Sequence, residues 1–100
     1  MSDKRCYMIV TADLTDRARF LADYARVVPA LVTRFGGRYL LQGSGGEFLE
    51  GGFCQSPSAL VSEWPSRAAA LAFWNSPEYA EAKKLREGTG KFQVLLLESA

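Results

Sequence analysis

Four short stretches of the chain are rich in hydrophobic, β-branched and aromatic residues, and each predicts a β-strand. The predicted strands are residues 6–12, 38–42, 59–64 and 91–98. Each stretch is bounded on at least one side by a charged residue, glycine or proline, which seldom continue a strand. The first strand and the end of the last are apolar at consecutive positions, unlike a strand that keeps one face in water.

The stretch between the first two strands has the spacing of an amphipathic helix. Its apolar residues recur at steps of three and four positions: Phe20, Tyr24, Val27, Val28, Leu31 and Phe35. Thr15 is expected to cap this helix. Pro29 is expected to kink it or to split it into two pieces, because proline removes a hydrogen bond and clashes with the preceding turn. Gly36 and Gly37 are expected to end it.

Two helix starts follow the third strand. Ser66 comes directly after a proline and is a good N-cap for a short helix over residues 67–75. Ser76 offers a second cap for a helix that runs from Pro77 towards Arg86. The residue after this proline is acidic and lies in the first turn, where the helix dipole favours a negative charge.

The predicted order of elements is β-α-β-β-α-β, with no internal repeat and no linker, so residues 1–100 are expected to form a single domain. This order is the ferredoxin-like plan of the α+β class, an antiparallel sheet with helices on one face. A glycine-rich turn follows the second strand at residues 43–46. Residues 47–50 are then expected to extend the hairpin, and residues 51–58 to form a loop.

The consecutive apolar positions predict that both faces of the sheet are covered. The two helical regions can cover only one face, so a second copy of the chain is expected to cover the other, as two facing sheets do in a dimeric α+β barrel. The alternative is that the loop at residues 51–58 folds across the open face.

Charge and composition exclude several partners. The formal net charge is +1, and 12 basic residues are scattered among 11 acidic ones, so nucleic-acid binding is not expected. No apolar run approaches the length of a signal sequence or a membrane span, so the expectation is a cytoplasmic protein without a membrane partner. Cys6 and Cys54 are too few for a disulfide framework and are expected to stay reduced.

The chain has no histidine, which is the usual general base near neutral pH and the commonest metal ligand. Its absence argues against serine and cysteine triads in their usual form and against a haem with a proximal histidine. The carboxylates of Asp13, Asp16 and Asp23 are not spaced as ligands of a cation site. We therefore expect no metal site and no cofactor.

Four motifs occur in order along the chain: FGGRYL at residues 35–40, LEG at 49–51, EWPS at 63–66 and SPEY at 76–79. This combination resembles the domain of unknown function 1330 family, within the dimeric α+β barrel superfamily. The resemblance covers Tyr7 to about Leu97 and implies the fold and a homodimer. It implies no single reaction, because related barrel families range from cofactor-free monooxygenases to isomerase-like and stress-associated proteins.

Most polar residues of these motifs have a structural interpretation as helix caps, but Arg38 and Glu63 are charges within strands. By alternation Arg38 shares a face with Leu40, and Glu63 shares a face with Val61, so each is expected to point into a partly buried layer. Buried charges are normally paired, which favours an Arg38–Glu63 ion pair. The alternative is that Arg38 holds an anionic or carbonyl group while Glu63 accepts a proton.

Two hypotheses for function remain open. The first is a homodimer that binds a small organic molecule in a cavity between sheet and helices, with Arg38, Glu63, Trp64, Trp74 and Tyr79 as candidate lining residues. Such a protein could be an enzyme of the cofactor-independent monooxygenase or isomerase type, with Glu63 and Arg38 as candidate catalytic residues. The second is a non-enzymatic structural or accessory dimer in which the same residues serve packing and capping.

Overall fold

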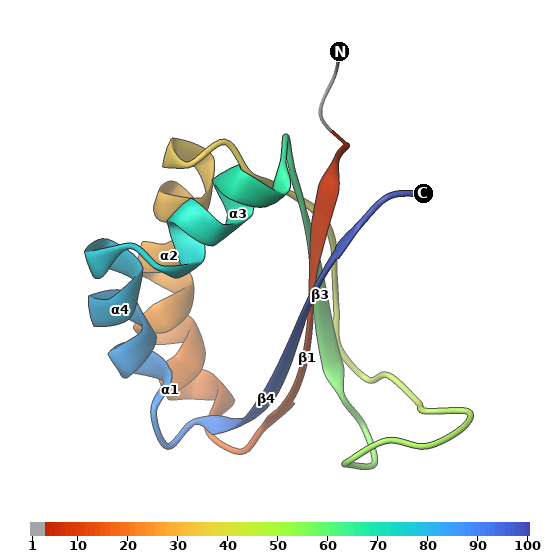
Figure 1. The fold of residues 1–100 in the computed structure, drawn as a ribbon. Coiled ribbons are helices and arrows are strands. Elements are labelled where there is room, and N and C mark those ends of the chain that lie inside the picture. Colours follow the sequence, from red (N-terminus) through yellow and green to blue (C-terminus); the bar gives the residue numbers. More distant parts are fainter. Residues whose placement is uncertain (1–3) are drawn as a thin grey trace.

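The computed structural model describes residues 4–100 and has one antiparallel sheet with the strand order β2-β3-β1-β4 (Figure 1). This is the predicted ferredoxin-like arrangement, which places the first strand in the middle of the sheet. The elements in chain order are β1 (Cys6–Leu14), α1 (Arg17–Ala22), α2 (Tyr24–Arg34), β2 (Arg38–Gly43), β3 (Ser58–Trp64), α3 (Arg67–Trp74), α4 (Pro77–Lys83), the 3-10 helix η1 (Lys84–Arg86) and β4 (Gly90–Glu98).

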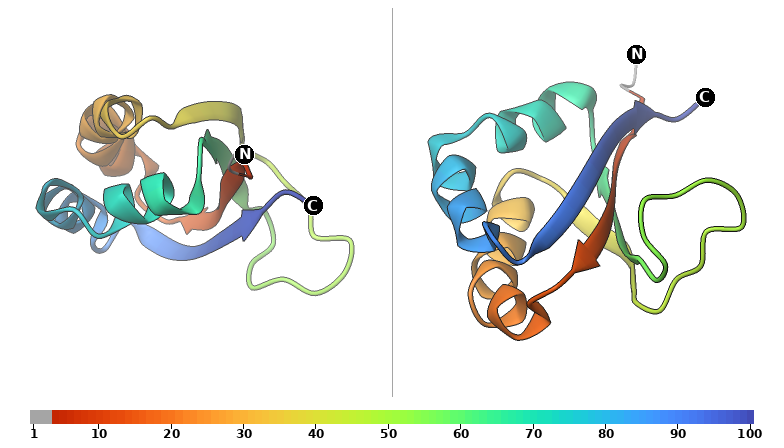
Figure 2. Two further views of the ribbon diagram at one scale, coloured as in Figure 1. Left: turned by 45° about the horizontal axis from the view of Figure 1, so that its top comes forward. Right: turned by 90° about the horizontal axis from the view of Figure 1, so that it is seen from below.

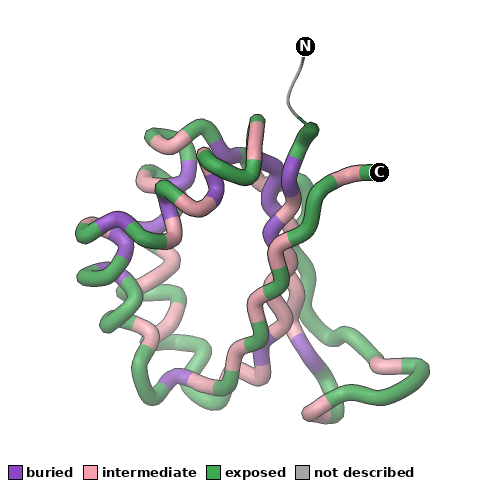
Figure 3. Tube along the Cα trace, viewed as in Figure 1, coloured by how far each residue is buried: buried purple, intermediate pink, exposed green. Residues whose placement is uncertain are grey.

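All helices lie on one side of the sheet, and the other side carries no helix in the part of the chain that the structure describes (Figures 1 and 2). The main hydrophobic core therefore forms between the helices and the sheet. In Figure 3 its buried segments lie mainly along α2, α3 and α4 and along the upper half of the strands. The core residues are Cys6, Met8, Val28, Val32, Trp64, Ala70, Phe73, Tyr79 and Ala82.

The first helical region differs from the sequence prediction in its cap and in its break. Asp16, and not Thr15, is the N-cap, because its carboxylate accepts a hydrogen bond of 3.1 Å from the backbone N–H of Arg19. The region is split at Asp23, between α1 and α2. Pro29 lies within α2 and does not split it; it is exposed, so water can reach the carbonyl that loses its partner.

The second helical region agrees with the prediction. The Ser66 side chain accepts a hydrogen bond from the backbone N–H of Ala69, and Ser76 accepts one from Tyr79, each at 3.1 Å. These caps fix the start of α3 and α4, and the expected Pro77 stands at the first position of α4. The last turn before β4 is the 3-10 helix η1 rather than a continued α-helix.

Residues 44–57 form a loop without a strand, so the predicted extension of the hairpin at residues 47–50 is wrong. Phe48 and Phe53 pack on each other across the loop, with ring centroids 5.8 Å apart, and Gly52 between them has a φ of 108°. This local packing replaces strand pairing. In Figure 1 the loop projects sideways from the lower end of the sheet, on the side away from the helices, and it leaves Leu41 and Leu95 of the open face 59% and 54% exposed.

Two further properties of residues 4–100 bear on function. No helix within these residues is long and apolar enough to cross a membrane. Within the same residues, no group of three or more histidine, cysteine, aspartate or glutamate side chains could hold a metal ion. Both cysteines are free thiols, Cys6 in the core and Cys54 in the loop.

Candidate functional site

The five candidate residues do not gather around one cavity. The strand register places Tyr7, Glu63 and Arg38 side by side on β1, β3 and β2. Their neighbours Cys6, Trp64 and Tyr39 belong to or pack against the core under the helices. Because side chains alternate along a strand, Glu63 and Arg38 point to the open face, away from the helices.

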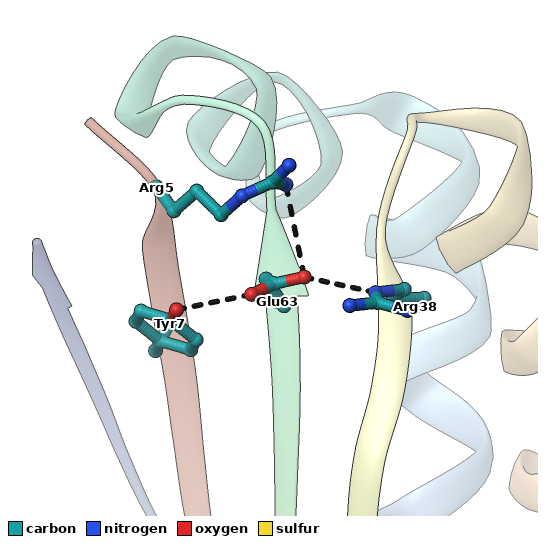
Figure 4. A network of polar contacts seen from close by, with 4 residues as sticks. All are labelled: Arg5, Tyr7, Arg38 and Glu63. Atoms are coloured by element: carbon teal, nitrogen blue, oxygen red, sulfur yellow. Dashed lines mark hydrogen bonds and ion pairs between the residues drawn. The ribbon is translucent and has the colours of Figure 1, made fainter. Parts of the chain in front are cut away.

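Glu63 is the centre of a polar network on the open face (Figure 4). Its Oε1 accepts a hydrogen bond of 2.8 Å from Arg38 Nε, and its Oε2 accepts one of 3.0 Å from the Tyr7 hydroxyl. Arg5 Nη1 lies 3.7 Å from Oε1. Only 9% of the Glu63 side chain is exposed, whereas 71% of the Arg38 side chain is, so the pair has one buried and one exposed member.

The network favours the ionised form of Glu63. The hydrogen bond from Arg38, and after it the one from Tyr7, hold the pKa of the Glu63 carboxyl below its usual range. The same contact raises the pKa of Tyr7, because a charged carboxylate stabilises the phenol that donates to it. The 2.8 Å contact confirms the predicted Arg38–Glu63 ion pair, but Arg38 is mostly exposed and does not lie in the partly buried layer that the sequence predicted.

The register corrects one detail of the prediction. Arg38 does not share its face with Leu40, because the β2–β3 pairing is irregular between Tyr39 and Leu41. This bulge adds one residue to β2, so Leu41 follows Arg38 on the open face and pairs with Val61.

The three aromatic candidates lie on the helix side and form part of the core. Trp64 and Tyr79 are 1% and 2% exposed, and both pack on Phe73 with ring centroids 5.0 and 4.5 Å from it. Trp64 Nε1 donates a hydrogen bond of 3.0 Å to Ser62 Oγ. Trp74 is half-buried, and Lys83 Nζ lies 4.6 Å from its ring centroid. None of the three lines the cavity described below.

A cavity of about 300 Å³ does lie between the sheet and the helices, at the end of the sheet where β1 passes into α1. Strand residues on the helix face form its floor, and α1, the start of α2 and η1 form its wall. Its lining residues are Val10, Ala12, Leu14, Arg17, Phe20, Leu21, Tyr24, Gln42, Gly43, Ser44, Ser58, Ala59, Leu60, Arg86 and Phe92. The sequence thus predicted the layer in which the cavity lies but not the residues around it.

Few polar groups face this cavity, and two of them are arginines. Arg17 Nη2 donates a hydrogen bond of 2.8 Å to Ser58 Oγ, which joins α1 to β3. The guanidinium of Arg86 lies over the Phe92 ring, 4.3 Å from its centroid. The hydroxyl of Tyr24 is 2.8 Å from that of Tyr79, and burial raises the pKa of Tyr24, so it stays a neutral phenol. The cavity therefore combines apolar walls with fixed donors.

Sequence reasoning missed most of these residues because each has an ordinary local role. Phe20 and Tyr24 lie on the apolar stripe of the first helical region, which indicates only core packing. Arg17 and Arg86 lie 69 positions apart (86 minus 17), and no motif joins them. A signal was present in the antiparallel pairing expected for this fold, which brings the end of β1 beside the starts of β3 and β4.

Comparison with known proteins gives one family and a group of related structures. The family described as "Domain of unknown function (DUF1330)" matches residues 5–100. No curated protein has a sequence that matches this chain.

Two solved structures illustrate the fold likeness. The RPA0582 protein of unknown function from Rhodopseudomonas palustris is 24% identical, covers 98% of this chain and 84% of its own, and has a TM-score of 0.79. SnoaB, a cofactor-independent oxygenase from Streptomyces nogalater, is 12% identical, covers 97% of this chain and 94% of its own, and has a TM-score of 0.69. At these identities the likeness shows the fold alone.

Proposed function

We propose that this chain, which belongs to the DUF1330 family, binds a small organic molecule in the cavity between its sheet and helices. The observation that carries the proposal is the cavity itself. Its volume of about 300 Å³ is at the lower end of the usual range for ligand pockets. Apolar walls with a few placed polar groups are typical of such pockets, and this cavity has both. The proposal is of binding and names no reaction.

The test is a titration of the protein with one- and two-ring aromatic probes, phenol, benzoate, 2-naphthol and 2-naphthoate, followed by amide chemical shifts. Binding in the cavity should shift the amides of Ala12, Ser58 and Leu60, which line its floor. Leu21→Trp should weaken this binding, because Leu21 lines the cavity from α1 and a larger side chain there fills part of it.

Val27→Trp is the matched control, because Val27 is a partly exposed apolar residue of α2 that does not line the cavity. It should leave binding unchanged. If no probe shifts the cavity amides at millimolar concentration, the binding proposal is wrong, and the non-enzymatic accessory dimer becomes the better explanation of the fold.

We also propose that a second copy of the chain covers the open face of the sheet. The apolar residues that this face presents come from all four strands: Ile9, Leu41, Val61, Leu95 and Leu97. Four strands spaced about 4.8 Å apart and up to about 30 Å long offer on the order of 600 Å² in projection. That is comparable to the roughly 800 Å² that each partner buries in a standard interface. Two such sheets can pack face to face at about 10 Å.

Sedimentation equilibrium at micromolar concentration tests the homodimer. The wild type should have twice the monomer mass, and Leu95→Asp should shift it to the monomer, because a charge within this apolar face would be buried unpaired. Val27→Asp places the same charge on the helix side and should leave the dimer intact. A wild type of monomer mass would rule out this assembly.

A further inference from the structure

The cavity carries two positive charges and no negative one. Its lining includes Arg17 and Arg86 but no aspartate or glutamate. Five ion pairs occur among residues 4–100, and neither of these arginines takes part in any of them. By contrast, Arg34 and Arg38 are each paired with a glutamate at less than 3 Å. The cavity therefore brings together two cations that form none of these ion pairs.

Both guanidinium groups are held in position by contacts that leave donors free. A guanidinium has five N–H donors, and the contact with Ser58 Oγ uses one of those of Arg17. Arg86 packs its guanidinium over the Phe92 ring and lies 5.7 Å from the centroid of the Tyr24 ring. Its backbone carbonyl accepts a hydrogen bond of 3.0 Å from the N–H of the fully buried Thr89, which fixes the end of η1.

The strand register sets the spacing of the two anchors. Ala12 pairs with Ser58 on one side and with Phe92 on the other, so these three residues lie side by side across β3, β1 and β4. Neighbouring strands are about 4.8 Å apart, so the contact points of Arg17 and Arg86 are separated by about 10 Å. The floor between them is apolar. A molecule lying on it would have an arginine at each side.

We propose that the ligand of this cavity is a small aromatic carboxylate of one or two rings, with its ring on the apolar floor and its carboxylate on the guanidinium of Arg86, the less exposed of the two arginines. This inference rests on the proposed binding function and names the chemistry of the ligand. Arginine binds carboxylates through paired, charge-assisted hydrogen bonds, which are about twice as strong as neutral ones. Since a dry apolar cavity of about 150 Å³ accepts one benzene ring, about 300 Å³ suits one or two rings.

The test compares two probes of nearly the same shape and different charge. Isothermal titration and amide shifts are measured with 2-naphthoate and with the neutral 2-naphthamide, for the wild type and for Arg86→Gln and Arg17→Gln. The carboxylate should bind the wild type at least tenfold more tightly than the amide. Arg86→Gln should weaken the binding of 2-naphthoate by about tenfold or more and leave the affinity for 2-naphthamide nearly unchanged. Arg17→Gln should act in the same direction but less, because Arg17 is exposed.

Arg26→Gln is the matched control. Arg26 is exposed on α2 and does not line the cavity, so its removal changes the net charge equally without touching the site. Melting temperatures show whether each variant is folded, and the exposed Arg17 provides a second test should Arg86→Gln fail to fold.

The outcomes separate this inference from the proposed function. If both probes bind equally and shift the amides at the cavity floor, the ligand need not be a carboxylate and this inference is wrong, while the cavity stays a binding site. A second outcome is that the wild type prefers 2-naphthoate while Arg86→Gln and Arg17→Gln reduce this preference no more than the control Arg26→Gln does. That result would show that the two arginines do not bind the carboxylate. Failure of both probes to bind would overturn this inference, and failure of phenol, benzoate and 2-naphthol as well would reject the proposed function.

Discussion

Gly37, one residue before β2, is a position where a single methyl group should measurably destabilise the fold. A Cβ built there would lie 2.8 Å from two atoms of the Trp64 ring, Cη2 and Cζ3, where ordinary contacts exceed 3.4 Å. The ring has little room to move, because it is 1% exposed, packs on Phe73 and donates a hydrogen bond to Ser62. Since the φ of Gly37 is not positive, alanine meets no backbone strain there, and the effect is one of packing alone.

The expected size of the effect follows from two opposing terms. Overpacking a buried site costs about 1–3 kcal/mol. Replacing glycine by alanine returns about 0.4–1 kcal/mol by restricting the unfolded chain. The net loss for Gly37→Ala is therefore about 1–2 kcal/mol, which lowers the melting temperature of a domain of this size by about 4–15 °C.

Gly43→Ala is the matched control at the other end of β2. Its Cβ would meet nothing within 4 Å and its φ is also not positive, so alanine should be neutral or slightly stabilising. Both variants are unfolded by heat and by urea, with circular dichroism as the readout and one protein concentration throughout. A Gly37→Ala protein that melts at or above the wild type would refute the packing argument.

Three further predictions follow from single contacts. Glu63→Gln should melt lower than the wild type at neutral pH. Because the pKa of Glu63 is lowered in the folded state, its contribution to stability is complete above the ordinary pKa of glutamate and is lost as the pH falls below that value. The melting temperatures of the two proteins should therefore converge in acid. Equal melting temperatures at neutral pH would mean that the network is not stabilising. Ser76→Ala removes the cap of α4 and should cost about 0.5–2 kcal/mol in urea unfolding, and a smaller loss would show that the Tyr79 N–H finds another acceptor. Under native conditions a thiol reagent should label Cys54 and spare Cys6, which is fully buried and whose pKa is raised by burial, and rapid labelling of both would contradict the core packing.

The sequence predicted the strands and their order because the local signals agreed with one another. Ser66 and Ser76 each predicted a helix that starts at the next residue, and in the structure they are the N-caps of α3 and α4. Of the two alternatives predicted for Pro29, a kink or a split, the split is wrong, because the break lies at Asp23. Proline is the strongest local breaker, but α1 starts where the Asp16 carboxylate accepts from the Arg19 N–H and ends where the backbone N–H of Asp23 donates to the Arg19 carbonyl. The second of these contacts involves only the backbone, so the residue type does not reveal it.

The residues that line the cavity were missed because they become neighbours only through the register of the sheet. Ser58 and Phe92 are 34 positions apart (92 minus 58), and each pairs with Ala12. A one-residue slip in either pairing would turn Leu60 or Phe92 to the open face. The placement of Arg38 suffered from the same limit, because the bulge that follows it shifts the alternation by one residue and leaves no mark in the sequence.

The alternation of β1 separates the two proposed contacts of this protein. Tyr7 and Ile9 point to the open face, where the second copy is proposed to dock, while Met8 and Val10 point to the core and the cavity. Contacts on one face thus reach the other only through the backbone of the shared strands. A variant that breaks the dimer on the open face, such as Leu95→Asp, should therefore keep its affinity for 2-naphthoate as long as the sheet stays folded. If affinity and dimer were lost together while the melting temperature held, the partner copy would have to contribute to the site.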